Sequence, residues 1–88
     1  ENRFVQEARK LGCKTRKLNG GGQRDWSDQL VLVPGGATLL IEFKRVGAKL
    51  RPTQQAFKDA CAAIGHTIHV YDSWQAALAI VRLHCHDR

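Results

Sequence analysis

Acidic residues, long apolar runs and paired cysteines are all scarce in this sequence. Eight Asp and Glu stand against 14 Lys and Arg, which gives a formal net charge of +6. No apolar run approaches the roughly 20 residues that a membrane-spanning helix needs, so no membrane span is predicted. Cys13, Cys61 and Cys85 are odd in number, widely spaced and free of any CxxC pair. This favours reduced thiols in a cytoplasmic protein over a disulfide framework.

The 88 residues contain no internal repeat, no low-complexity tract and no sign of a second domain. We therefore expect one small domain over residues 1–88. No N-terminal stretch combines the charged, apolar and small-residue zones of a signal peptide. No membrane partner and no organic cofactor are expected.

The positive charge is concentrated between residues 14 and 51, which points to a polyanionic partner. The cations in this segment are Lys14, Arg16, Lys17, Arg24, Lys44, Arg45, Lys49 and Arg51. A basic chain can simply be soluble, but here the cations surround acidic residues, which favours nucleic acid. Trp26 lies in the same segment; it can stack on a base or sugar, or it can cover the core.

The hydrophobic pattern predicts an α/β fold, a small mixed sheet flanked by helices in the order α-β-β-β-α-β-α. A helix is expected over 2–11, a strand over 13–18, a hairpin over 28–33 and 37–44, a helix from Pro52 to Gly65, and a strand over 67–71. A last helix follows a cap at Asp72 or Ser73. The second helix has an apolar stripe of Phe57, Ala60, Cys61 and Ile64; the last has Trp74, Ala77, Leu78 and Val81.

The hairpin brings two carboxylates together. If Pro34-Gly35-Gly36 forms the loop, Val33 faces Ala37, and the antiparallel register places Asp28 directly opposite Glu42. Their Cβ atoms would then lie roughly 4.5–5.5 Å apart, where two carboxylates repel each other unless a cation lies between them. Lys44 shares the face of Glu42, while Phe43 points to the other face. An acidic pair beside a lysine in a basic chain indicates a metal-dependent phosphodiesterase.

These residues and their order resemble the virus-type replication-repair nuclease domain (VRR-NUC) of the PD-(D/E)XK nuclease superfamily, which has a restriction-endonuclease-like fold. The matching features are Glu1, Lys17, Asp28, the Val33-Pro-Gly-Gly36 turn, Glu42-Phe-Lys44 and Gly47-x-Lys49-Leu50-x-Pro52-x-Gln54. Two positions depart from the family pattern. Ser27 stands where a proline is usual, and Asp25 stands where glycine is usual; Asp25 could cap the loop or contact a metal through water.

The resemblance implies that Asp28, Glu42 and the backbone carbonyl of Phe43 ligate Mg²⁺ or Mn²⁺, with Glu1 contacting the metal through water. It also implies that Lys44 orients the attacking water and that Gln54 holds that water or Lys44. Each has a plainer alternative: a cap at the strand start for Asp28, an exposed ion pair for Glu42 and Lys44, and solvated or helix-end roles for Gln54, Glu1 and Lys17. The His84-Cys85-His86 cluster lacks the second ligand pair of a structural zinc site.

The predicted function is therefore a Mg²⁺- or Mn²⁺-dependent DNA endonuclease of a bacterial or phage-encoded cytoplasmic protein. The resemblance implies branched DNA, such as a four-way (Holliday) junction, as substrate and a homodimer as the active form. Trp74, Ile80 and Leu83 on the last helix are the expected dimer contacts. DNA contacts are expected from Lys14, Arg16, Lys17, Arg24, Trp26, Arg45, Lys49 and Arg51. The alternative is a catalytically silent nucleic-acid-binding module with a nuclease fold.

Overall fold

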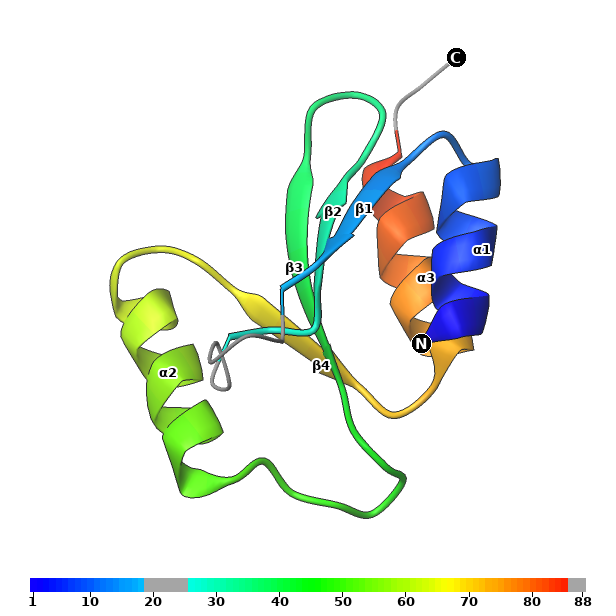
Figure 1. The fold of residues 1–88 in the computed structure, drawn as a ribbon. Helices are drawn as coiled ribbons and strands as arrows, with labels where there is room; N and C mark the ends of the chain where they lie inside the picture. Colours follow the sequence, from blue (N-terminus) through cyan, green and yellow to red (C-terminus); the bar gives the residue numbers. More distant parts are fainter. Residues whose placement is uncertain (19–25, 86–88) are drawn as a thin grey trace.

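A computed structural model describes residues 1–18 and 26–85. The elements are α1 (Asn2–Lys10), β1 (Lys14–Lys17), β2 (Gln29–Leu32), β3 (Thr38–Phe43), α2 (Pro52–Ala63), β4 (Ile68–Tyr71) and α3 (Trp74–His84) (Figure 1). This is the predicted order, and the predicted fold class of a mixed sheet flanked by helices is confirmed. Within these two segments, no helix combines the length and the apolar character needed to cross a bilayer.

The four strands form one sheet in the order β1-β2-β3-β4. The first three strands pair antiparallel, whereas β4 runs parallel to β3, so α2 belongs to the crossover that a parallel pair requires. In the β2–β3 hairpin the Val33 N–H donates to the Ala37 carbonyl at 2.9 Å, and Gln29 faces Ile41. The register predicted from the turn length is confirmed.

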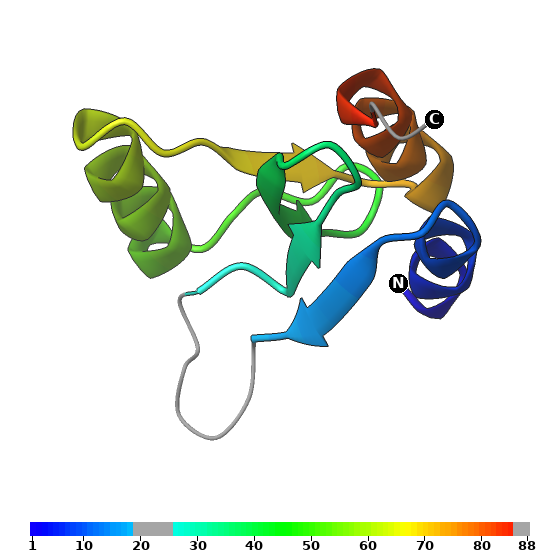
Figure 2. The same cartoon turned by 90° about the horizontal axis from the view of Figure 1, so that it is seen from above.

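The hydrophobic core lies between the sheet and the pair α1 and α3. Figure 2 shows both helices on one side of the sheet and α2 on the other. The buried core side chains are Phe4, Ala8, Cys13, Val31, Val33, Leu39, Ile41, Ala77, Leu78 and Val81. Phe43 extends this core at the end of β3, with its ring centroid 5.3 Å from that of Phe4. The apolar stripe predicted for the last helix therefore faces the core.

Local signals account for the ends of these two helices. Gly12 follows α1 with φ +92°, and a Cβ there would lie 3.2 Å from Cγ of Pro34. Glycine is therefore favoured both by the backbone conformation and by the close approach of the hairpin turn. At the start of α3, the Ser73 Oγ accepts a hydrogen bond from the Ala76 N–H at 3.1 Å. Ser73, not Asp72, is the cap.

The apolar stripe of α2 is not part of the core. Phe57, Ala60, Cys61 and Ile64 recur at helical spacing, yet α2 has no buried residue and Ile64 is 76% exposed. The helix stands beside the sheet and contacts it chiefly at β4. Helical periodicity identifies which side of a helix is apolar, but it does not say whether the same chain covers that side.

Candidate active site

The two predicted carboxylates lie at the end of the sheet where β2 begins and β3 ends. Continuing the register from the Gln29–Ile41 pair places Asp28 opposite Glu42, as predicted. Both residues are buried, with only 8% of Asp28 and 7% of Glu42 exposed. The Phe43 N–H donates to Oδ2 of Asp28 at 2.7 Å, which fixes this carboxylate against the neighbouring strand. The hairpin thus holds two acidic groups side by side with little water around them.

Burial makes it costly for both groups to be charged. Desolvation, followed by the charge of Asp28, raises the pKa of Glu42 to about 7. The charge of Arg51 and a backbone hydrogen bond from Asp28 lower this pKa, and the charge of Glu1 raises it further, by smaller amounts. An acidic pair under such repulsion is stabilised by a cation, and its oxygen donors suit a hard divalent ion such as Mg²⁺.

The donor set of a metal site here would be small. Within residues 1–18 and 26–85, no three His, Cys, Asp or Glu side chains gather as a ready metal-binding group. The carboxylates of Asp28 and Glu42 would therefore need to be completed by a backbone oxygen and water. The backbone of Phe43 borders the pair, since its N–H already contacts Asp28. Oxygen-only coordination with several waters is the usual arrangement for Mg²⁺ in proteins.

Gln54 connects helix α2 to this pair. It occupies the third position of α2, where its Oε1 accepts from the Arg51 N–H at 2.9 Å. Its Nε2 donates to Oε2 of Glu42 at 3.1 Å. Gln54 is therefore not the solvated first-turn glutamine that was the plainer alternative. The geometry places its amide on Glu42, whereas the resemblance implied a bond to water or to Lys44.

Glu1 reaches the same end of the sheet from the start of α1. Its Oε2 accepts from Gln29 Nε2 at 2.6 Å and from Lys17 Nζ at 3.1 Å. Burial acts to raise the pKa of Glu1, but the hydrogen bonds from Gln29 and Lys17 and the nearby positive charges outweigh it, and the pKa is lowered. Glu1 is thus held as an anion close enough to Glu42 to affect its titration.

Gln29 is a site residue that the sequence reasoning missed. Its side chain is buried and holds Glu1, which fastens α1 to the strand that carries Asp28. A signal was present: Gln29 is a polar residue on the face of β2 that Val31 and Val33 present to the core. A polar side chain in such an alternation requires a hydrogen-bond partner.

Lys44 does not contact Glu42 in this structure. Its Nζ donates to the carbonyl of Ala48, four residues further along the chain, and its backbone N–H donates to the Tyr71 carbonyl. The ammonium is therefore bound to the loop that follows β3. This loop also carries Arg45, Lys49 and Arg51, all exposed. These cations follow Glu42 closely along the chain, and the charge of Arg51 acts on its carboxylate.

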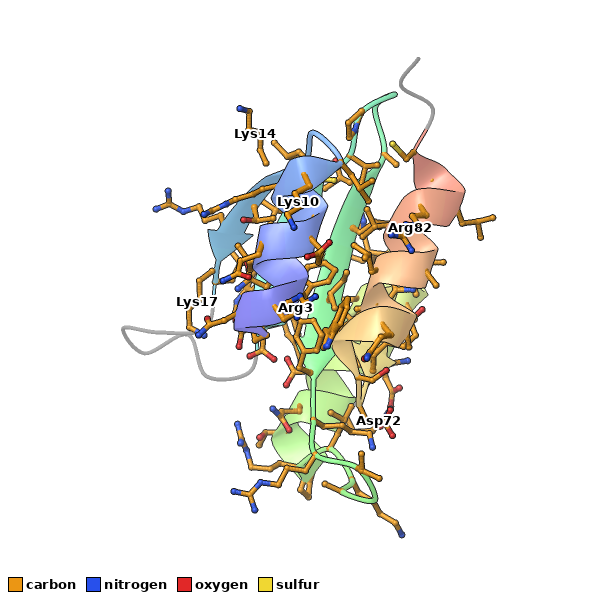
Figure 3. The ribbon with its side chains drawn as sticks, turned by 90° about the vertical axis from the view of Figure 1, so that its right-hand side faces the viewer. Arg3, Lys10, Lys14, Lys17, Asp72 and Arg82 are labelled. Atoms are coloured by element: carbon orange, nitrogen blue, oxygen red, sulfur yellow. The ribbon has the colours of Figure 1, made fainter. Side chains whose placement is uncertain are left out.

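The other predicted nucleic-acid contacts are spread more widely. Figure 3 shows Lys14 and Lys17 at opposite ends of β1, and only Lys17 lies at the end that carries the carboxylates. Arg16 is exposed on the same strand, and Arg24 lies outside the described residues. Trp26 packs on helix α2, with its ring centroid 4.9 Å from that of Phe57, and 42% of it stays exposed. Neither alternative for Trp26 anticipated this helix contact.

The two departures from the family pattern and the C-terminal cluster fall in different places. Ser27 is buried beside Asp28, and its Oγ has no hydrogen-bond partner among the described atoms. Asp25 and His86 lie outside the described residues. Nδ1 of His84 is 2.9 Å from the Ile80 carbonyl, which is an ordinary contact within a helix.

Comparison with known proteins identifies the family of this chain. No protein-family model matches the chain. A protein of Acyrthosiphon pisum secondary endosymbiont phage 1 named "Putative nuclease p44" is 36% identical over 73 residues, which cover 83% of this chain and 78% of the phage protein. A solved structure described as "VRR_NUC domain" superposes with a TM-score of 0.73 and 25% identity, over 93% of this chain and 94% of that chain. The chain belongs to the VRR-NUC family of nucleases. As a VRR-NUC nuclease it acts on nucleic acid, and Asp28 and Glu42 are its candidate catalytic pair.

Proposed function

We propose that this VRR-NUC nuclease is a Mg²⁺- or Mn²⁺-dependent endonuclease that hydrolyses phosphodiester bonds in DNA. The observation that carries the proposal is the buried, directly opposed pair of Asp28 and Glu42. These two carboxylates and the carbonyl of Phe43 would hold the cation, with Glu1 contacting it through water. Once bound, a divalent cation supplies an activated water and neutralises charge on the phosphate and the leaving oxygen.

The remaining roles belong to the chain itself. Gln54 holds one oxygen of Glu42 in place by a 3.1 Å hydrogen bond, so helix α2 orients this ligand. The ammonium of Lys44 stabilises negative charge on the phosphate; since it has three N–H donors, one of them can stay on the Ala48 carbonyl. Arg45, Lys49 and Arg51 hold neighbouring phosphates. Gln29 and Lys17 keep Glu1 ionised beside the pair.

The finer proposal is that the enzyme cuts branched DNA, such as a four-way junction, as a homodimer. Two symmetric cuts need two active sites, and a C2 dimer supplies both. The expected contact through α3 requires correction, because Trp74 and Ile80 pack against the core and only Leu83 is largely exposed. The apolar surface open to a partner lies on the α2 side. It consists of exposed Leu32 and Ile64 and a groove of about 590 Å³ lined by Leu30, Thr38, Leu40, Gly65, His66, Thr67 and His69.

Cleavage of four DNA forms tests the activity. Four-way junction, flap, duplex and single-stranded DNA would be incubated with EDTA, Mg²⁺ or Mn²⁺, using the wild type and Glu42→Gln. We expect cation-dependent cleavage by the wild type, strongest on the junction, and none by the variant. If the wild type binds these DNAs but cuts none of them with either metal, the protein is a catalytically silent nucleic-acid-binding module and the proposal is wrong.

Sedimentation tests the dimer. The wild type should sediment as a dimer at micromolar concentration, and Ile64→Glu should give monomers because it places a charge in the apolar surface beside α2. The matched control is Leu83→Glu, an equally drastic change at an exposed position on α3. A wild type that stays monomeric on junction DNA would contradict the dimer while leaving the nuclease assignment in place.

A further inference from the structure

Val46 occupies the tip of a well-defined turn after β3. The Ala48 N–H donates to the Arg45 carbonyl at 3.0 Å, and Gly47 has φ +81°. This is the pattern of a turn that needs glycine at its third position and places Val46 at the apex. Val46 is 81% exposed, the highest value among the exposed large apolar side chains of the described residues. An apolar side chain at an apex of this kind contributes nothing to the core.

A single exposed valine is ordinary, but the surroundings of this one are not. Arg45 precedes it, and Lys49 and Arg51 follow within the same exposed segment. Figure 1 shows this loop extending beyond the end of β3, away from the β2–β3 hairpin. An apolar tip between cations is therefore presented on its own, clear of the sheet. This combination matches the way apolar wedges are delivered to nucleic acids, with cations gripping the phosphates on either side.

The tip is also fixed relative to the catalytic pair. At the start of the loop, Lys44 Nζ donates to the Ala48 carbonyl. This bond ties the turn to Lys44, which lies two residues after Glu42. At its end, Gln54 bonds both the Arg51 N–H and Glu42. Both ends of the segment 44–54 are therefore anchored to the active site. Whatever base step Val46 touches will lie at a set distance from the phosphate that is cut.

We propose that Val46 is a wedge that inserts at a distorted or branched step of the DNA while Arg45 and Lys49 hold the flanking phosphates. The inference rests on the proposed function and deepens it by naming a residue that selects the DNA form. Unstacking a base step costs a few kcal/mol in continuous duplex and least where the stack is already broken. A wedge therefore favours branch points over duplex without reading any base.

The test measures base unstacking in EDTA, so that no DNA is cut. A four-way junction would carry 2-aminopurine at the branch point, and a duplex of the same sequence would carry it at its centre. We expect wild-type binding to raise the fluorescence of the junction probe, Val46→Ser to abolish this rise, and Val46→Leu to retain it. Val46→Ser should lower junction affinity about tenfold and leave duplex affinity unchanged. Leu83→Ser, at another exposed apolar position, is the matched control and should behave as the wild type.

A Val46→Ser variant with wild-type fluorescence and a wild-type ratio of junction to duplex affinity would overturn the wedge. The readout does not depend on catalysis, so the two proposals fail separately. If the wild type cuts DNA while Val46 has no effect, the nuclease proposal stands and the wedge is wrong. If the wild type cuts nothing in any metal, the proposed function is wrong, and the fluorescence still decides the role of Val46.

Discussion

The two faces of the sheet differ in what their side chains do. The face under α1 and α3 is built of buried apolar residues such as Val31, Leu39 and Ile41. The other face carries the buried carboxylate of Glu42, and the helix on that side, α2, has no buried residue. Adjacent residues of one strand, Ile41 and Glu42, belong to the two faces. Stability therefore comes from one side of this small sheet, while the other side carries the candidate catalytic residues and the surface open to partners.

The largest expected difference between the faces is seen in this adjacent pair. Glu42→Ala should reduce cleavage to background while the protein stays folded, because it removes a proposed metal ligand and relieves repulsion with Asp28. Ile41→Ala should lower the free energy of unfolding by about 2–5 kcal/mol, because it opens a cavity in the core. Cleavage assays and urea unfolding of both variants measure the two effects. If Glu42→Ala kept substantial activity, or unfolded at room temperature, the division between a catalytic face and a stabilising face would be wrong.

Lys44 should matter for rate and not for metal binding. Lys44→Ala is expected to slow cleavage about 10²- to 10³-fold, the range for loss of one group that stabilises developing charge. Lys44→Arg should not restore the rate, because a planar guanidinium does not replace a compact ammonium. Single-turnover rates at saturating metal, together with a calorimetric metal titration, separate the two roles. A variant that turns over normally but binds metal weakly would place Lys44 with the ligands instead.

The buried carboxyl of Glu42 should also make the free energy of unfolding depend on pH. With a pKa of about 7 in the folded, metal-free protein and about 4.5 when unfolded, Glu42 keeps its proton in the folded state while the unfolded chain loses it. Its contribution to stability therefore falls as pH rises from about 4.5 to 7. Glu42→Gln removes this dependence and should gain about 1–2 kcal/mol relative to wild type between pH 5 and pH 8, allowing for solvent screening.

Urea unfolding in EDTA at both pH values provides the measurement. Asp59→Asn, an exposed carboxylate on α2, is the control and should show no such gain. A Glu42→Gln variant whose stability relative to wild type is the same at pH 5 and pH 8 would show that burial of this carboxyl is not costly.

The smallest effect concerns how DNA is held. Neutralising Lys49 and Arg51 together should reduce the salt slope of binding by roughly one to two units, at about 0.9 per duplex phosphate contact. Neutralising Lys10 and Arg82, on the helices that cover the other face (Figure 3), removes the same net charge and should leave the slope nearly unchanged. Equal changes in the two double variants, measured by fluorescence anisotropy between 50 and 200 mM salt, would mean that DNA does not prefer the α2 side.

The carboxylate pair could be predicted from sequence because only local rules are involved. A three-residue turn and strict alternation fix the pairing of Asp28 with Glu42 once Val33 faces Ala37. The contacts of Gln54 and Glu1 could not be derived in this way. They depend on how α2 and α1 meet the end of the sheet, which is set by packing between elements distant in sequence. For α2, the pattern of Phe57 and Ile64 identified an apolar side without revealing that Phe57 packs on Trp26 while Ile64 stays exposed.

Calorimetric titration of the metal-free protein with Mn²⁺ at pH 8 tests the central claim most directly. If Asp28 and Glu42 form the metal site, the wild type should bind Mn²⁺, and both Asp28→Asn and Glu42→Gln should lose measurable binding while their circular dichroism stays that of the wild type. Repeated at pH 6, below the pKa of about 7 of Glu42, binding should also release protons, since the cation displaces the proton of Glu42. Equal Mn²⁺ affinity in the wild type and both variants would contradict the assignment of these carboxylates as the catalytic pair.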